Sequence, residues 1–215
     1  MIDRGSTLGV ERLAAQRGYV TLFSGVTFSV RGGGALVITG PNGSGKTTLL
    51  RILAGLTAPA DGEIRWRQAR VGPFDARLRD AVAFNGHLPA LKDELSAEQN
   101  LSDWIALDDR SVAREAIAAA LDAVALERQR GLPVRVLSQG QRRRIGLARL
   151  RLVARPLWIL DEPLTALDAD GAGVLGELLA AQLDGGGLCV VASHQPLPLP
   201  AARVRSIGLV PATQR

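Results

Sequence analysis

The sequence predicts an α/β fold, and three observations support this prediction. Two short apolar runs, Ala35–Thr39 and Leu188–Ala192, have the composition of strands buried on both faces of a sheet. A third apolar run, Leu157–Leu160, leads directly into two acidic residues. A glycine-rich loop follows the first run, and the pattern from Thr47 to Leu56 then predicts a helix. Buried strands that end in polar residues and alternate with helices are typical of open α/β sheets.

The middle of the chain, roughly residues 75–135, has a different character and is expected to be helical. Ser96 and Gln99 have the spacing of a capping box, in which each side chain satisfies a free backbone N–H at the start of a helix. A second helix is expected to begin near Ser111. The region is therefore predicted to be a helical subdomain inserted between two strand-bearing parts. Three further elements are expected: a half-buried strand at Val26–Val30, a helix from about Gly140 to Ala154, and a last strand at Val204–Val210.

Bulk composition indicates a globular protein. The 215 residues suffice for one large domain or two small ones, and 47% hydrophobic with 22% charged residues excludes a disordered or fibrous chain. The single cysteine, Cys189, excludes an internal disulfide and lies in an apolar run, so we interpret it as a small core residue. No uninterrupted apolar run reaches membrane-spanning length.

Positive charge is concentrated in one stretch of the sequence. The net charge is +5, and residues 128–160 contain nine arginines and no acid. A nucleic-acid surface is one interpretation. A solvated helix face combined with phosphate contacts is another, and charge alone does not separate the two.

The glycine-rich loop after the first apolar run matches the P-loop pattern in full. Its glycines allow backbone N–H groups to surround phosphates, and the helix that follows adds a favourable dipole. Lys46 would reach the β- and γ-phosphates, and the Thr47 hydroxyl would bind Mg²⁺. The strand before the loop and the helix after it remove most chance matches, so the sequence predicts ATP binding. The expected binding residues here are Gly40, Pro41, Asn42, Gly43, Ser44, Gly45, Lys46, Thr47 and Thr48.

The two acids after Leu157–Leu160 are candidates for the chemistry of hydrolysis. Asp161 would hold Mg²⁺ through water, and Glu162 would polarise the attacking water. By itself this pattern is also compatible with two acids in an ordinary loop after a strand, with no functional role. Downstream of a P-loop it predicts a second nucleotide motif.

The segment Leu137–Gln141 reads Leu-Ser-Gln-Gly-Gln and is followed by three consecutive arginines. Here the chain resembles the ATP-binding cassette (ABC) family and its signature motif. The resemblance implies a P-loop NTPase (RecA-like) core with an antiparallel β part and an inserted α-helical subdomain. It implies one ABC ATP-binding domain over residues 1–215, with the core at about 1–85 and 150–215 and the helical subdomain at about 86–149. It also implies that Ser138, Gly140 and Gln141 contact ATP held by a second subunit, so that the chain works as a homodimer.

Further matches to the family pattern occur in the expected order. Thr165–Asp168 resembles the loop that touches the partner subunit, and His194 resembles the switch histidine that contacts the γ-phosphate. Lys46, Glu162 and His194 are therefore the expected catalytic residues. The family's Mg²⁺-sensing glutamine is replaced by His87, which joins Thr47 and Asp161 as an expected metal-contacting residue. The residue that stacks on adenine is either Tyr19 or Arg17.

Other stretches are similar to one subgroup, the ATP-binding subunit of the bacterial cytochrome c maturation system. They are Gly86–His87, Pro89–Leu101, Trp158–Asp168 and Ser193–Pro196. This similarity implies an ATPase that powers haem export, peripheral to the cytoplasmic face of the bacterial inner membrane. The implied partners are a second ATP-binding subunit and the integral membrane permease subunits of that system, with no nucleic acid.

Four other functions compete with this one. Another small-substrate ABC transporter would carry the same ATPase motifs. A soluble ABC ATPase of translation or DNA repair typically has tandem cassettes or long coiled-coil insertions, for which 215 residues leave no room. A non-hydrolysing regulatory module conflicts with the presence of Lys46, Asp161, Glu162 and His194. A small-molecule kinase would not need Leu137–Gln141.

Overall fold

The computed structural model describes residues 5, 7–87, 89–108 and 111–211. The chain forms two compact units. The core unit comprises Met1–Gly86, Arg155–Pro163 and Leu179–Arg215, and the helical unit comprises His87–Ala154 and Leu164–Leu178. The ends of the predicted domain, residues 1 and 215, lie outside the described residues.

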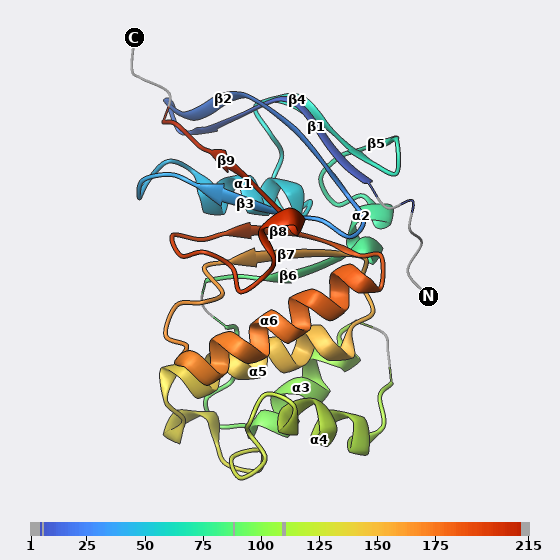
Figure 1. Ribbon diagram of the computed structural model, residues 1–215, viewed down its shortest axis with the longest axis vertical. Coiled ribbons are helices and arrows are strands. Elements are labelled where there is room, and N and C mark those ends of the chain that lie inside the picture. Colours follow the sequence, from blue (N-terminus) through green and yellow to red (C-terminus); the bar gives the residue numbers. More distant parts are fainter. Residues whose placement is uncertain (1–4, 6, 88, 109–110, 212–215) are drawn as a thin grey trace. The chain divides into compact units, whose positions relative to one another are not determined.

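A five-stranded parallel sheet forms one layer of the core unit (Figure 1). Its strand order is β6-β7-β8-β3-β9. Every residue of β7 and β8 is buried, which confirms the prediction of strands covered on both faces. Helix α1 (Lys46–Leu53) packs against these two strands. The strand bounds are Ala35–Thr39 for β3, Val82–Asn85 for β6, Leu157–Asp161 for β7, Leu188–Ala192 for β8 and Val204–Gly208 for β9.

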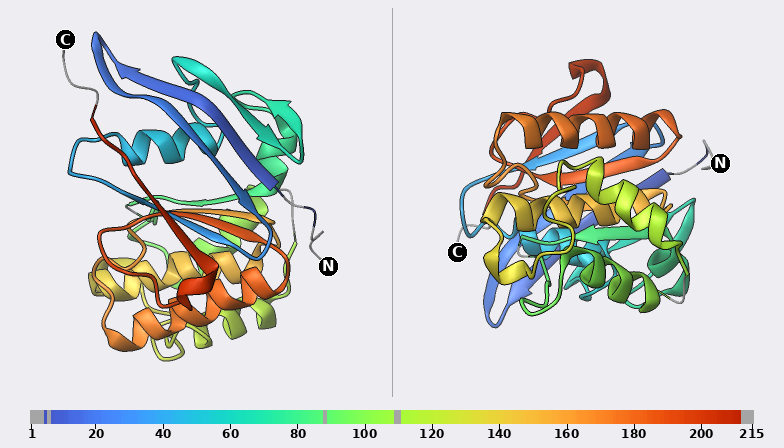
Figure 2. Two further views of the ribbon diagram at one scale, coloured as in Figure 1. Left: turned by 45° about the horizontal axis from the view of Figure 1, so that its top comes forward. Right: turned by 90° about the horizontal axis from the view of Figure 1, so that it is seen from below.

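The other sheet of the core unit is antiparallel, with strand order β2-β1-β4-β5. The left view of Figure 2 shows the long hairpin of β1 and β2. The expected strand at Val26–Val30 is the end of β2, which is much longer than predicted. The bounds are Thr7–Arg17 for β1, Val20–Arg31 for β2, Asp61–Trp66 for β4 and Ala69–Val71 for β5. The short helix α2 (Ala76–Ala81) leads from this sheet to β6.

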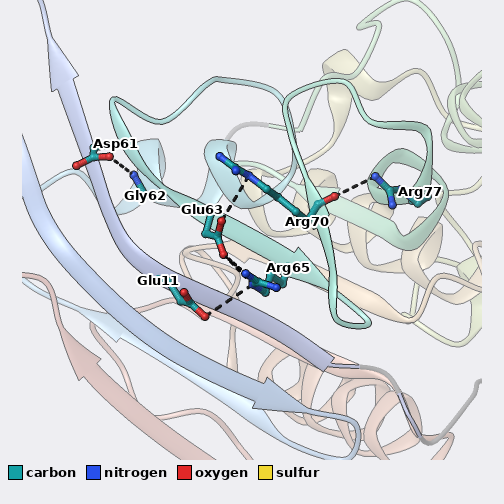
Figure 3. A network of polar contacts seen from close by, with 7 residues as sticks. All are labelled: Glu11, Asp61, Gly62, Glu63, Arg65, Arg70 and Arg77. Atoms are coloured by element: carbon teal, nitrogen blue, oxygen red, sulfur yellow. Dashed lines mark hydrogen bonds and ion pairs between the residues drawn. The ribbon is translucent and has the colours of Figure 1, made fainter.

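Charged side chains link three strands of the antiparallel sheet (Figure 3). Glu11 of β1 and Glu63 of β4 are direct cross-strand partners, and like charges in that position repel each other. Arg65 contacts both: its Nε lies 2.7 Å from Glu63 Oε1 and 3.7 Å from Glu11 Oε1. Arg70 of β5 approaches Glu63 Oε2 at 3.5 Å. The arginines thus offset a repulsion that the strand register would otherwise impose.

The helical unit contains α3, α4, α5 and the start of α6. The predicted capping box of α3 is confirmed, because Gln99 N donates to Ser96 Oγ at 3.2 Å and Ser96 N to Gln99 Oε1 at 2.8 Å. Helix α4 begins at Arg114, slightly later than the expected start near Ser111. The bounds are Ala97–Ala106 for α3, Arg114–Asp122 for α4, Gln139–Leu152 for α5 and Ala169–Asp184 for α6.

Each unit has its own apolar interior. In the core unit, buried side chains of α1 and of both sheets form one cluster, with Phe23, Ile38 and Leu50 among its members. In the helical unit, α4 packs against α3 and α5, and Leu101, Leu121 and Ile145 are fully or almost fully buried. None of the helices in the described part of the chain is long and apolar enough to cross a membrane.

Candidate functional site

Three neighbouring strands of the parallel sheet end at candidate site residues. β7, β8 and β3 are adjacent in the sheet and run parallel, so their carboxyl ends meet at one edge. The P-loop follows β3, Asp161 and Glu162 lie at the end of β7, and Ser193 and His194 follow β8. The sheet topology therefore brings together residues that are more than a hundred positions apart in sequence.

The P-loop backbone depends on glycine at two places. Gly40 has φ 147°, and a Cβ there would lie 2.5 Å from Leu209 O. Gly45 has φ 93°, and a Cβ there would lie 2.9 Å from the Phe23 ring. Gly45 also precedes α1 without a side-chain cap, so the first amides of the helix remain open to an anion.

The Lys46 side chain folds back over the P-loop and contacts the backbone at the start of this loop. It is 8% exposed, and its Nζ donates hydrogen bonds to Gly40 O at 2.7 Å and to Pro41 O at 3.3 Å. The same Nζ lies 3.1 Å from Nε2 of His194. The ammonium group is thus held where the loop closes, at the place to which phosphates would be drawn.

Thr47 and Asp161 form a pair of oxygen donors. Thr47 Oγ1 donates to Asp161 Oδ2 at 2.8 Å. A hydroxyl and a carboxylate are ligands that Mg²⁺ prefers, and this ion usually takes only one or two protein ligands beside phosphates and water. Among the described residues, no group of three or more His, Cys, Asp or Glu side chains is placed to hold a metal without such help. The donor set therefore fits Mg²⁺ that arrives with a nucleotide.

Glu162 and His194 face each other across the ends of β7 and β8. Glu162 Oε1 lies 3.4 Å from His194 Nε2, and the glutamate side chain is 17% exposed. One ring nitrogen cannot accept from Lys46 and donate to Glu162 at once, so the tautomer of His194 decides which contact forms. Glu162 has φ 49°, a region that non-glycine residues rarely occupy, and its N–H donates to Ala192 O at 2.9 Å. Strain of this kind tends to occur at functional sites.

Ser193 stabilises the turn that contains His194, which follows β8. This role was not predicted from the sequence. Its side chain is buried, accepts a hydrogen bond from Gln195 N at 3.0 Å and donates to Gln195 O at 2.7 Å. Such a local turn is typical of serine, and it fixes the backbone on both sides of His194.

The signature segment lies in the helical unit, where it starts α5. Ser138 is the N-cap of this helix: its Oγ accepts from Gln141 N at 3.2 Å, and Gln141 Oε1 accepts from Ser138 N at 2.9 Å. This second capping box has the same spacing as the one at Ser96, and it was not predicted. At Gly140, a Cβ would lie 2.8 Å from Ala166 O. The helix N-terminus predicted for the signature is confirmed.

The predicted residues His87, Tyr19 and Arg17 are on the surface. His87 belongs to the helical unit, its side chain is exposed, and its carbonyl accepts a hydrogen bond from Arg143. Tyr19 is fully exposed in the turn between β1 and β2, close in sequence to the exposed Arg17. An aromatic or guanidinium group in that turn is accessible to a stacking ligand.

The concentrated arginines of residues 128–160 meet acids from other parts of the chain. Most of these contacts are partly exposed, so each contributes little to stability. At least five of the nine arginines nonetheless have an acidic side chain next to them. The ion pairs are Arg130 with Glu98 and Asp122, Arg135 with Glu94, Arg142 with Asp93, Arg144 with Asp168, and Arg155 with Asp80.

Comparisons with known proteins agree with this geometry. The model of the ABC transporter family matches residues 23–165. The chain is 45% identical to the cytochrome c biogenesis ATP-binding export protein CcmA of Pseudomonas aeruginosa, over 91% of this chain and 97% of that one. It is 42% identical to the protein of the same name from Nitrosomonas europaea, over 94% and 95% of the two chains. A solved dimeric ATP-binding cassette in a post-hydrolysis state, bound to ADP and Pi, shares the fold with a TM-score of 0.75, 24% identity and coverage of 87% and 88%. The chain belongs to the ABC transporter family and, within it, to the CcmA family of cytochrome c biogenesis ATP-binding export proteins.

Proposed function

We propose that this chain is the ATP-hydrolysing subunit of an ABC transporter that powers haem export for cytochrome c maturation. The observation that carries the proposal is the convergence of Lys46, Thr47, Asp161, Glu162 and His194 at one edge of the parallel sheet. The names of the relatives, which refer to cytochrome c biogenesis and export, support the process. The working form would be a homodimer on integral membrane permease subunits, peripheral to the cytoplasmic face of the bacterial inner membrane.

ATP would bind first to the open loop of the core unit. The amides of Asn42–Thr48 and the N-terminus of α1 would surround the phosphates. Lys46 would exchange its carbonyl partners for phosphate oxygens of higher charge, which form stronger hydrogen bonds. Tyr19 or Arg17 would stack on the adenine. Thr47 and Asp161 would hold Mg²⁺, with His87 near it in the assembled site, and the ion would offset the negative charge of the phosphates.

Glu162 is suited to orient the attacking water. Its side chain is mostly shielded from solvent, and its carboxylate oxygen lies 3.4 Å from Nε2 of His194. The water would attack the γ-phosphorus in line, while Lys46 and His194 stabilise the charge on the transferred group. Removal of one positioned general base typically costs about 10²–10⁴ in rate.

The second copy would complete the site. Ser138, Gly140 and Gln141 would contact the γ-phosphate bound by the opposite chain, so ATP would hold the two chains together. Loss of phosphate would remove that link and let the chains separate, and the helical unit would carry the motion to the permease. The dimeric form of the solved cassette that resembles this chain supports such an arrangement.

A Glu162→Gln variant tests the ATPase part of the proposal. It should bind ATP as well as the parent chain and release phosphate at least about 100-fold more slowly, because only the water-orienting carboxylate is lost. Gel filtration with ATP should then show a trapped dimer. Undiminished hydrolysis would remove Glu162 from its role.

Deletion of the gene tests the haem part. We expect loss of covalent haem staining of c-type cytochromes, with b-type cytochromes retained, and a Lys46→Ala strain should reproduce the deletion. Attachment of haem outside the membrane needs an energy source on the ATP-containing side. Normal haem staining in both strains would assign the ATPase to another small-substrate transporter.

A further inference from the structure

The loop Thr165–Asp168 lies directly against the start of α5, within the helical unit. A Cβ on Gly140 would come within 2.8 Å of Ala166 O, so no other side chain fits there unless the loop moves. Ala166 itself has φ 63°, an unusual conformation that the surrounding contacts must maintain. The backbone of the loop and the backbone of the signature segment are therefore packed as one surface.

Arg144, on the same helix, fixes the far end of this loop. Its guanidinium forms an ion pair and hydrogen bond with Asp168 Oδ1, and its Nη1 lies 3.5 Å from Val124 O. The Arg144 side chain is only 11% exposed, whereas Asp168 is 67% exposed. The arginine is therefore held by the helix packing, and the more exposed aspartate is the group that it positions.

Asp168 is also the cap of the next helix. Its Oδ1 accepts from Gly171 N at 2.9 Å in the first turn of α6. This N–H and then the Arg144 guanidinium hold the pKa of Asp168 below its ordinary value, so the carboxylate stays charged at neutral pH. A Cβ on Gly171 would lie 3.0 Å from Asp168 Oδ1 and 3.2 Å from Arg144 Nε, which leaves little room for movement at this junction.

We propose that Arg144 is a positioning residue that locks the Thr165–Asp168 loop onto α5, so that the loop and the signature segment meet a partner chain in one fixed geometry. This inference rests on the proposed function, in which both segments approach the ATP bound by a second copy. Arg144 acts through Asp168 and not through contact with the nucleotide. A preformed geometry matters because segments that are ordered before closure lose less entropy when the dimer forms.

The test combines a mutant cycle with two readouts. Arg144→Gln, Asp168→Asn and the double variant are compared with Arg151→Gln, which removes an exposed arginine from the same helix. Hydrogen exchange without nucleotide reports on the amides of residues 165–171. Steady-state hydrolysis reports kcat and KM for ATP.

We expect faster exchange over residues 165–171 in Arg144→Gln, while Arg151→Gln behaves like the parent chain. The kcat of Arg144→Gln should fall about 10-fold or more, since small misplacements of reacting surfaces are costly, while KM changes by no more than about two-fold. The double variant should be no worse than the more affected single variant, because both changes break the same contact. Arg144→Lys retains the charge and should recover part of kcat, which also guards against a folding defect in Arg144→Gln.

The outcomes separate the two proposals. Unchanged exchange and kcat in Arg144→Gln would overturn the positioning role, as would fully additive effects in the double variant. If the parent chain does not hydrolyse ATP, the proposed function fails, and the exchange comparison still decides whether Arg144 holds the loop.

Discussion

Two helices of this protein begin at segments that are proposed to bind phosphate, and their N-termini are built in opposite ways. α1 starts after Gly45, which has no side chain and makes no side-chain cap. α5 starts after Ser138, whose capping box with Gln141 already satisfies two N–H groups. An open N-terminus is unfavourable until an anion arrives, whereas a capped one is stable alone. The first arrangement suits a ligand held by the same chain, and the second suits a surface that must be ready before a partner approaches.

The largest effect is expected at the open terminus. Lys46→Ala should weaken ATP binding by about 10- to 100-fold, because charge-assisted hydrogen bonds to the phosphates are lost. Isothermal calorimetry on the isolated chain measures this. Lys92→Ala is a matched control, since Lys92 is the only other lysine and pairs with Asp103 at 2.8 Å on the surface. Equal losses in the two variants would mean that Lys46 contributes only charge.

The capped terminus should respond differently to a bulky cation. Ser138→Arg should leave ATP affinity of the single chain nearly unchanged, yet reduce turnover by about 10-fold or more, because the side chain blocks the approach to the partner's phosphate. The measurements are ATP titration and phosphate release on the same sample. Lost ATP affinity with intact turnover would mean that the signature segment serves its own chain.

A smaller change at Ser138 separates its contribution to helix capping from its contribution to ATP turnover. Ser138→Ala and Ser96→Ala each remove the hydroxyl from a Ser-x-x-Gln capping box, and each should lower the free energy of unfolding by about 1 kcal/mol. Only Ser138→Ala should also lower turnover. Urea unfolding gives the first quantity and phosphate release the second. If both variants keep full turnover, the Ser138 hydroxyl is a cap and nothing more.

The smallest effect concerns a third kind of helix start. α2 is capped by Asp75, which accepts from Arg77 N at 2.9 Å, and the Arg77 side chain holds the pKa of Asp75 below its ordinary value of 3.8. Because the folded pKa is lowered, the stabilising contribution is present above about pH 4 and is lost as pH falls through the folded value. Carboxyl chemical shifts during an acid titration should show the lowered pKa, and Arg77→Gln should raise it. A titration at the ordinary value would show that this charged cap is absent in solution.

Most features that depend only on neighbouring residues in the sequence were predicted, whereas features that depend on contacts between distant residues were not. The buried strands β3, β7 and β8 were evident because a strand covered on both faces is a continuous apolar run. Strand β1 was missed, because its register shifts between Val10 and Leu13, where Arg12 has φ 47°, and this shift breaks the alternation of buried and exposed residues.

In the candidate site, too, some features were predictable from the local sequence and others were not. Motif residues were identified individually, but the contact of Arg144 with Asp168 and the turn at Ser193 depend on tertiary packing that no local pattern records. The capping box at Ser138 was encoded locally. It was not predicted because Ser138 and Gln141 also belong to the signature motif, which indicates ligand contacts instead of a helix cap.

The single cysteine has a practical consequence for studies of the dimer. Cys189 lies in the middle of the parallel sheet with no exposed surface, and burial raises the pKa of its thiol, so the reactive thiolate does not form near neutral pH. The natural chain therefore behaves as a cysteine-free background toward maleimide reagents. A spin label or fluorophore could be attached to a cysteine introduced at the exposed Leu107, outside the proposed ATP site, without removing Cys189. Distances between two such labels would follow the approach and separation of two chains during the ATP cycle.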